Sequence, residues 1–206
     1  MRWAPTPGDL RIVLGLGNPG SRYEGTRHNV GSAAVDQIAV RAGVTWSETL
    51  GTAWTARADR AGGPVVLAKP RLFMNLAGLS AAALTEEFGV DPRSLVVVVD
   101  DADLEFGRLR IRPSGSCAGH NGVRSIAEAL GTSEFVRVRL GVRGAGRLEG
   151  QLAEYVLARF EDHESGGAAA LVEAGADAVE FLLLHGVVAA MNEFNGRRLA
   201  AVPREC

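Results

Sequence analysis

The sequence has little cysteine, a single lysine (Lys69) and no long apolar run. Its two cysteines, Cys117 and Cys206, are too few and too far apart for a disulfide framework or a cysteine zinc site. No apolar stretch approaches the roughly 18 residues that cross a bilayer, and the first residues do not resemble a signal peptide. These absences favour a reduced, cytoplasmic protein with no membrane association.

Motifs of several hydrolase classes are also missing. There is no Gly-x-Ser-x-Gly turn for a serine nucleophile, and the residues around Cys117 form no pattern typical of a catalytic cysteine. The His-Glu-x-x-His spacing of zinc hydrolases is absent as well. We therefore expect neither a serine or cysteine nucleophile nor a zinc site.

Positive and negative charges are distributed unevenly, although the formal net charge is only −2. The stretch 108–147 holds eight arginines and two acids, whereas 149–193 holds nine acids and one arginine. Such asymmetry is expected of a surface that binds an anionic ligand beside an acidic remainder. Ordinary solvated surface charge explains the same pattern equally well.

Apolar periodicity predicts alternating strands and helices. Strands are predicted at 10–15, 54–59, 65–69, 95–99, 108–112 and 136–142, and helices at 30–41, 75–89, 123–130, 151–160 and 167–195. This order predicts an α/β fold, a single domain over residues 1–206 with a central mixed, mostly parallel sheet flanked by helices. Residues 1–9 and 197–206 are expected to form an irregular leader and tail.

Two of the predicted strands, 108–112 and 136–142, alternate arginine with apolar residues. This alternation indicates that part of the sheet is antiparallel or lies at an edge. Ligands of such sheets gather outside the carboxyl ends of the strands. The loops after Leu14 and after Val99 are therefore the places to look for a site.

The first of these loops begins with Gly-x-Gly-x-x-Gly at 15–20, which resembles a dinucleotide-binding turn. That fingerprint needs a helix to open within the glycine turn, so that its N-terminus meets the pyrophosphate. Here a polar loop follows, and no helix begins convincingly before Asn29. The required acid after a second strand is also missing, because Asp36 lies inside the helical stretch. A dinucleotide site is therefore disfavoured.

His28 lies in this polar loop, just before the helix. Most single histidines are structural, but imidazole titrates near neutrality and can accept a proton from water. A base of this kind needs a carboxylate to orient it. Asp100, at the end of the 95–99 valine run, is the best candidate. The acids that follow, Asp101 and Asp103, leave a simple turn or a magnesium site open as alternatives.

Three asparagines, Asn18, Asn75 and Asn121, lie in separate loops beside glycine, methionine or histidine. Asn75 and Asn121 precede predicted helices, so either could simply cap a helix or turn the chain. Together they form a stronger signal, because neutral amides can bind a peptide or ribose, or polarise an ester carbonyl, without adding charge.

The motifs taken together resemble those of bacterial peptidyl-tRNA hydrolase. The longest is Gly-Leu-Gly-Asn-Pro-Gly-x-x-Tyr-x-x-Thr-Arg-His-Asn-Val-Gly at 15–31. Others follow in order: Phe-Met-Asn-Leu-Ala-Gly at 73–78, Asp-Asp-Ala-Asp-Leu at 100–104, Gly-His-Asn-Gly at 119–122, Arg-Leu-Gly-Val at 139–142, Glu-Tyr-Val-Leu at 154–157 and Ala-Met-Asn-Glu-Phe-Asn at 190–195. The resemblance covers roughly residues 10–196.

This resemblance implies a monomeric α/β enzyme of translation that cleaves the ester between a peptide and the terminal ribose of tRNA, without a cofactor or metal. It implies that His28 is the catalytic base, that Asp100 keeps it basic, and that Asn18 distinguishes N-blocked from free aminoacyl esters. Substrate-contacting positions match Tyr23, Phe73, Asn75 and Asn121. Arg112 and Arg139 match basic residues near tRNA phosphates.

The chain departs from the family pattern at three places: Ser116-Cys117-Ala118 replaces a glycine-rich Gly-His-Gly, Ala77 replaces a serine, and Ala102 replaces a larger apolar residue. None of these is the base, its acid or an asparagine. Two rival hypotheses are a non-catalytic RNA-binding relative and a nucleotide-dependent enzyme that uses the 15–20 turn. Retention of His28, Asp100 and all three asparagines argues against the first.

Overall fold

The computed structural model describes residues 9–60, 62–144 and 152–199, so most of the expected leader and tail lies outside the described residues. One seven-stranded sheet runs through this part of the chain in the order β2-β3-β4-β1-β5-β7-β6. The strands are β1 Arg11–Gly15, β2 Ser47–Thr49, β3 Ala53–Arg60, β4 Gly63–Pro70, β5 Leu95–Glu105, β6 Leu109–Arg112 and β7 Val136–Arg143.

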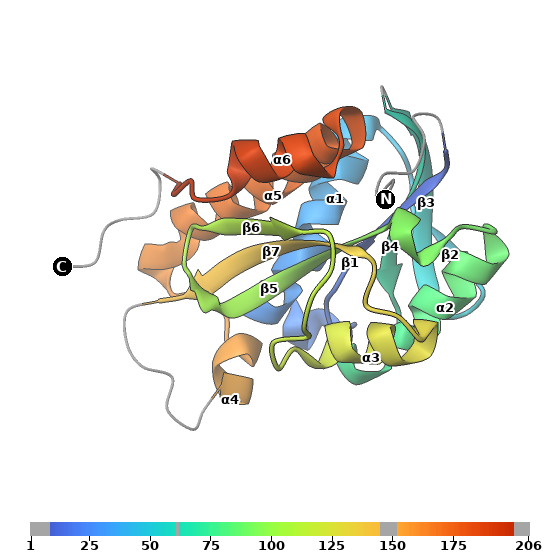
Figure 1. Ribbon diagram of the computed structural model, residues 1–206. Helices are drawn as coiled ribbons and strands as arrows, with labels where there is room; N and C mark the ends of the chain where they lie inside the picture. The colour runs from blue at the N-terminus through green and yellow to red at the C-terminus, as the bar shows by residue number, and fades with distance from the viewer. Residues whose placement is uncertain (1–8, 61, 145–151, 200–206) are drawn as a thin grey trace.

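Helices cover both faces of the sheet (Figure 1). The helices are α1 Val30–Ala42, α2 Ala77–Glu87, α3 Asn121–Leu130, α4 Leu152–Leu157, α5 Ser165–His185 and α6 Val187–Phe194. One apolar core lies between the sheet and α1, α5 and α6. A second core lies between the opposite face and α2 and α3. No helix in the described ranges is long and apolar enough to cross a membrane.

The mixed α/β sheet predicted from the sequence is confirmed. The central pairs β1–β4, β1–β5 and β5–β7 are parallel, and the outer pairs β2–β3, β3–β4 and β6–β7 are antiparallel. β5 opens with a fully buried apolar run, as expected of a strand covered on both faces. The arginine-alternating strand 108–112 corresponds to β6, which is the antiparallel edge strand.

Several element boundaries differ from the sequence prediction. β5 continues to Glu105, six residues past the valine run, because Asp100 and Asp101 still pair with β7. Asp100 therefore lies inside a strand and not in the loop after it. The predicted helix 167–195 is divided at Gly186, which has φ +83 and separates α5 from α6. The three-residue strand β2 was not predicted, since so short a segment has no readable periodicity.

Two glycines bring the start of α1 against the sheet. A Cβ on Gly15 would lie 2.5 Å from the carbonyl oxygen of Gly31, and a Cβ on Gly31 would lie 2.3 Å from the carbonyl oxygen of Val98 in β5. Only glycine allows such close contact between backbones. The turn that precedes α1, which contains His28, is consequently held beside the middle of β5.

Candidate active site

His28 and Asp100 are in direct contact, although 72 residues separate them in the sequence. His28 lies in the 3₁₀ turn Arg27–Asn29 immediately before α1, and its Nδ1 is 2.8 Å from Oδ1 of Asp100. Both residues are buried, with 9% of His28 and 4% of Asp100 exposed. The sequence predicted that these two side chains would meet, and they do so at a position within β5, before its carboxyl end.

A second histidine, His120, binds the same carboxylate oxygen. Its Nε2 lies 3.0 Å from Oδ1 of Asp100, and the two imidazole rings are 4.9 Å apart. His120 is also the N-cap of α3, where its Nδ1 accepts a hydrogen bond from Val123 N–H at 3.3 Å. Sequence reasoning noted His120 only as a neighbour of Asn121. The signal available was its position just before a helix, within Gly-His-Asn-Gly.

These hydrogen bonds indicate which nitrogen carries the proton when each ring is neutral. Because Nδ1 of His120 accepts, its proton is on Nε2 and is donated to Asp100. His28 likewise donates its Nδ1 proton to Asp100, which leaves Nε2 with a free lone pair. Burial alone raises the pKa of Asp100, but the charges and hydrogen bonds of His120 and His28 lower it well below its usual range. Asp100 therefore remains an ionised acceptor.

His28, Asp100 and His120 also meet a spacing criterion for a metal site. One ligand atom from each lies within 4.8 Å of the others. In the present arrangement the carboxylate oxygen already accepts two hydrogen bonds, and the two facing nitrogens carry the protons. Binding of a metal ion by these atoms would require both nitrogens to release their protons.

The turn that carries His28 is anchored by its buried neighbour Arg27. Nη2 of Arg27 contacts Oε2 of Glu164 at 2.5 Å, and Nη1 donates to the carbonyl of Arg159 at 2.7 Å. The guanidinium lies 4.3 Å from the ring centroid of Tyr155 in α4. The sequence analysis did not identify this role. The contacts join the His28 turn to the segment that follows α4, more than 130 residues away.

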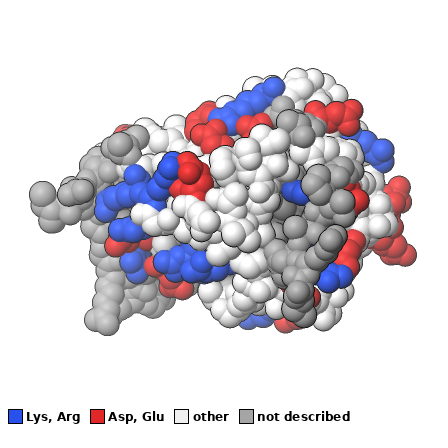
Figure 2. Space-filling view, turned by 45° about the horizontal axis from the view of Figure 1, so that its top comes forward, with Lys and Arg blue, Asp and Glu red and all other residues white. Residues whose placement is uncertain are grey.

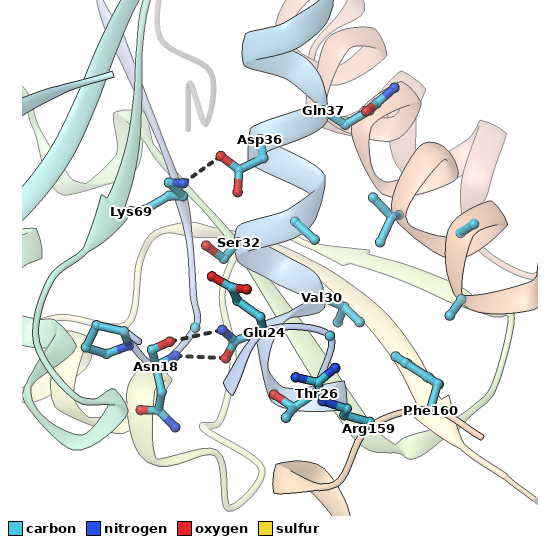
Figure 3. Close-up of a pocket in the computed structure, with 18 of the residues that line it drawn as sticks. Asn18, Glu24, Thr26, Val30, Ser32, Asp36, Gln37, Lys69, Arg159 and Phe160 are labelled. Atoms are coloured by element: carbon cyan, nitrogen blue, oxygen red, sulfur yellow. Dashed lines mark hydrogen bonds and ion pairs between the residues drawn. The ribbon is translucent and has the colours of Figure 1, made fainter. Parts of the chain in front are cut away.

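Asn18 connects two loops around the centre. Its backbone N–H and carbonyl pair with the side-chain amide of Asn29 at 2.9 and 3.0 Å (Figure 3). Its own Oδ1 accepts a hydrogen bond from Met74 N–H at 2.8 Å. The oxygen of the Asn18 amide therefore accepts from the protein, and among the described residues no hydrogen bond from its Nδ2 group is found.

The residues on either side of Met74 are exposed. The ring of Phe73 meets that of Tyr23 edge to face, with centroids 6.2 Å apart. Asn75 lies in the 3₁₀ turn Met74–Leu76, and no hydrogen bond to its side chain is found among the described residues. It does not cap α2, since Leu76 holds that position. The capping alternative is therefore wrong for Asn75, and its side chain is free to bind a ligand.

Asn121 is the first residue of α3 and is exposed. His120 occupies the N-cap position, so Asn121 does not cap the helix either. Its Oδ1 accepts a hydrogen bond from Nη2 of Arg124 at 2.6 Å, which leaves its Nδ2 to donate. A Cβ on Gly122 would lie 2.5 Å from the sulfur of Met74, so α3 begins directly against the turn that holds Asn75.

The two predicted phosphate-binding arginines lie in different environments. Nε of Arg139, on β7, is 2.9 Å from Oδ2 of Asp101, the residue after Asp100. Burial raises the pKa of Asp101. Asp101 also accepts from Asp103 N–H at 3.0 Å, which gives the acidic cluster a structural role. Arg112 lies on the edge strand β6, two strands from β5, where it is exposed. The structure therefore places Arg139 next to the centre and Arg112 away from it.

Two hollows flank the His28 turn. The smaller one has a volume of about 210 Å³ and contains the Asp100 centre. Its lining includes His28, Asp100, His120, Asn121, Arg139 and the α4 residues Leu152, Ala153, Val156 and Leu157. The larger one, about 780 Å³, lies along α1, where Lys69 and Asp36 form an ion pair (Figure 3). Its lining lacks His28 and Asp100, so the smaller cavity is the candidate site.

Comparison with known proteins gives consistent results. A family model described as peptidyl-tRNA hydrolase matches residues 12–202. A peptidyl-tRNA hydrolase of Chloroflexus aurantiacus is 45% identical over 186 residues, 89% of this chain and 98% of that protein. One from Rhodococcus jostii is 43% identical over 189 residues, 91% and 98% of the two chains. The crystal structure of the Acinetobacter baumannii peptidyl-tRNA hydrolase superposes with a TM-score of 0.85 at 28% identity, covering 95% of this chain and 99% of that one.

Proposed function

This chain belongs to the peptidyl-tRNA hydrolase family, and from that premise we propose that it cleaves the ester between peptide and tRNA with His28 as the general base. The observation that carries the assignment is the 2.8 Å contact between Nδ1 of His28 and Asp100. Because that bond holds the Nδ1 proton, the basic nitrogen is Nε2. No hydrogen bond to this Nε2 is present within the described residues, so it is available to water.

In the proposed reaction, Nε2 of His28 removes a proton from water as its oxygen attacks the ester carbonyl carbon. The negative charge of Asp100 stabilises the imidazolium that forms, and His120 holds that carboxylate in place. The bond between the carbonyl carbon and the ribose oxygen then breaks, and the imidazolium returns the proton to the ribose oxygen. The products are tRNA with a free terminal hydroxyl and a peptide carboxylic acid, which releases its proton to solvent to become the carboxylate.

The asparagines supply directional hydrogen-bond donors to the substrate. Met74 N–H donates to Oδ1 of Asn18 and so fixes the orientation of the amide, which presents Nδ2 as a donor to the substrate. A donor binds the carbonyl of a blocked amino group and has nothing to offer a free ammonium, so Asn18 would favour N-blocked esters. Asn121 presents Nδ2 for the same reason, and the exposed Asn75 can steady the oxyanion or orient water.

The tRNA itself would be held through its phosphates. Arg112 and Arg139 lie on β6 and β7, in the part of the chain where arginines outnumber acids. Tyr23 and Phe73 would contact the substrate near Asn18. The monomeric state, the single domain over 1–206 and the cytoplasmic location stay predictions.

Hydrolysis of N-acetyl-aminoacyl-tRNA by His28→Ala tests the base. We expect kcat to fall roughly 10²- to 10⁴-fold, the usual contribution of a general base, with little change in KM. His163→Ala is the matched control, since this histidine is 66% exposed and lies outside both hollows. Wild-type cleavage rates in a well-folded His28→Ala protein would overturn the assignment. Wild-type protein that binds tRNA but releases no peptide would instead support a non-catalytic role.

A further inference from the structure

The motif at 190–195 is not explained by the chemistry of the site, and its last residue, Asn195, binds the outer edge of β6. Oδ1 of Asn195 accepts a hydrogen bond from Ile111 N–H at 2.6 Å, and its Nδ2 donates to the Ile111 carbonyl at 3.2 Å. One residue of an antiparallel strand presents both of these groups on the same side. The Asn195 amide therefore pairs with β6 as a neighbouring strand would.

The residues after Asn195 continue along the same edge. Arg198 forms an antiparallel bridge with Arg108, and Leu199 N–H donates to the carbonyl of Gly107 at 2.9 Å. β6 has only four residues and pairs with a single strand, β7, within the described sheet. Such a strand has an open row of backbone groups and little stability of its own. The Asn195–Leu199 segment supplies the missing second partner.

This pairing determines how the arginines of β6 are presented. Ile111 is fully buried in the core beneath α6, whereas its neighbours Arg110 and Arg112 are exposed on the other face. Because Ile111 directs its backbone groups to Asn195, Arg110 and Arg112 direct theirs to β7, opposite Arg139 and Arg137. The strand that carries the two exposed arginines is thus hydrogen-bonded on both edges, to β7 on one and to Asn195 on the other.

The side chains of Arg110 and Arg112 are available to an anionic ligand. Neither forms an ion pair with any residue in the described ranges, in contrast to Arg108, which is paired with Glu105, and Arg139, which is paired with Asp101. Figure 2 shows blue side chains, with red ones among them, on the side where Figure 1 draws β6 and β7. Two unpaired arginines two residues apart on a strand face lie about 7 Å apart, so that one polyanionic backbone can contact both.

We propose that Asn195 is a positioning residue for tRNA binding, and that Arg110 joins Arg112 in the phosphate contact that Asn195 holds in place. The inference rests on the proposed function, because it takes tRNA as the ligand of β6. Asn195 lies at the end of α6, whose apolar residues pack in the core, so α6 provides a rigid support for the exposed strand. Loss of the amide would let β6 fray without altering the Asp100 centre.

The first measurement compares Asn195→Ala with Asn192→Ala, an exposed asparagine one turn earlier on α6. On full-length N-acetyl-aminoacyl-tRNA we expect Asn195→Ala to raise KM roughly threefold to tenfold, as loss of one or two ordinary hydrogen bonds would, with kcat within about twofold. On N-acetyl-aminoacyl-adenosine, which lacks the phosphate backbone, both variants should match wild type. The Ile111 amide should exchange with solvent faster only in Asn195→Ala.

The second measurement is a double-mutant cycle with Arg110→Ala/Arg112→Ala. The slope of log affinity for tRNA against log salt should fall by about one per lost phosphate contact. Adding Asn195→Ala to the double variant should change the affinity and the slope no further. Asn195→Asp should behave like Asn195→Ala, because its second oxygen would face the Ile111 carbonyl. If Asn195→Ala does not fold, the Asn195→Asp variant is used in its place to test the role of the amide.

An Asn195 variant that melts earlier but keeps the wild-type KM and salt slope would overturn the proposal and leave Asn195 a purely structural role. If Arg110→Ala/Arg112→Ala binds tRNA like wild type, β6 does not contact phosphate, and the inference fails whatever Asn195 does. If wild-type protein does not cleave the full-length substrate, the proposed function itself fails. Failure of the Asn195 role, of the arginine contact and of the proposed function would therefore each give a different result.

Discussion

The buried centre at Asp100 and the exposed strand β6 use charge in opposite ways. Asp100 is 4% exposed, and both imidazoles that face it are hydrogen-bonded to one oxygen. Arg110 and Arg112 are exposed, and neither has an ion-pair partner among the described residues. Charge in the low-dielectric interior acts through exact partners, whereas charge at the surface is screened by water and salt. Changes in the centre should therefore affect kcat, and changes on β6 should affect binding.

The largest expected effect comes from Asp100→Asn. An asparagine amide can present N–H to Nδ1 of His28, which would move the imidazole proton to Nε2 and remove the base. We expect kcat to fall about 10³- to 10⁴-fold with a KM near that of wild type. Stopped-time assays of N-acetyl-aminoacyl-tRNA cleavage measure this, and near-normal turnover would show that Asp100 does not set the tautomer.

Removal of His120 should have a smaller effect on the same step. His120→Ala deletes one of the two hydrogen bonds on Asp100 together with the cap of α3. The expected loss in kcat is roughly 10- to 100-fold, the cost of one charge-assisted hydrogen bond. His120→Asn tests the cap separately, because asparagine is a good N-cap residue. Full activity in His120→Asn would assign His120 to the helix rather than to the carboxylate.

Arg112→Ala tests the expectation that changes on the exposed strand β6 affect tRNA binding and not kcat. We expect tRNA affinity to fall a few-fold, the salt slope to fall by about one, and kcat to be unchanged, because a phosphate contact is lost. Arg93→Ala is a suitable control, since Arg93 is an exposed arginine paired with Asp91. A lower kcat with unaltered binding would contradict the division between centre and edge.

The smallest expected effect is on stability in acid. The folded-state pKa of Asp100 lies below its unfolded value of 3.8, so the folded state favours the ionised form. Its contribution to stability is complete well above pH 3.8, begins to decrease as the pH falls through that value, and is lost as the pH falls further through the folded-state pKa. Denaturant titrations should show the unfolding free energy of wild type falling in this range. The difference between wild type and Asp100→Asn should narrow there, and a constant difference would argue against a lowered pKa.

Local sequence patterns predicted most elements of the fold. The valine run predicted the start of β5, and Gly43, in the left-handed conformation, ends α1 as expected of a C-terminal glycine. Element ends were less predictable. Asp100 was expected after a strand but lies inside one, because its backbone still pairs with β7. That pairing depends on a strand more than 30 residues later, which no local window contains.

The candidate site, like the fold, has features that the sequence predicted and features that depend on long-range contacts. The sequence was sufficient to propose His28, Asp100 and the asparagines as a set, since their residue types and motifs suit ester hydrolysis. It did not show that Met74 occupies the oxygen of Asn18, or that Arg27 anchors the turn through Glu164. These contacts join loops between 56 and 137 residues apart, so their partners become known only when the chain is folded.

The sequence by itself determined the α/β fold and the family, because periodicity and motifs are properties of short segments. Only the tertiary structure decided that two histidines share one oxygen of Asp100, and that Asn195 completes the edge of β6. Both are pairings between distant polar groups. Their geometry is set by how helices and strands pack, and packing is a property of the whole chain.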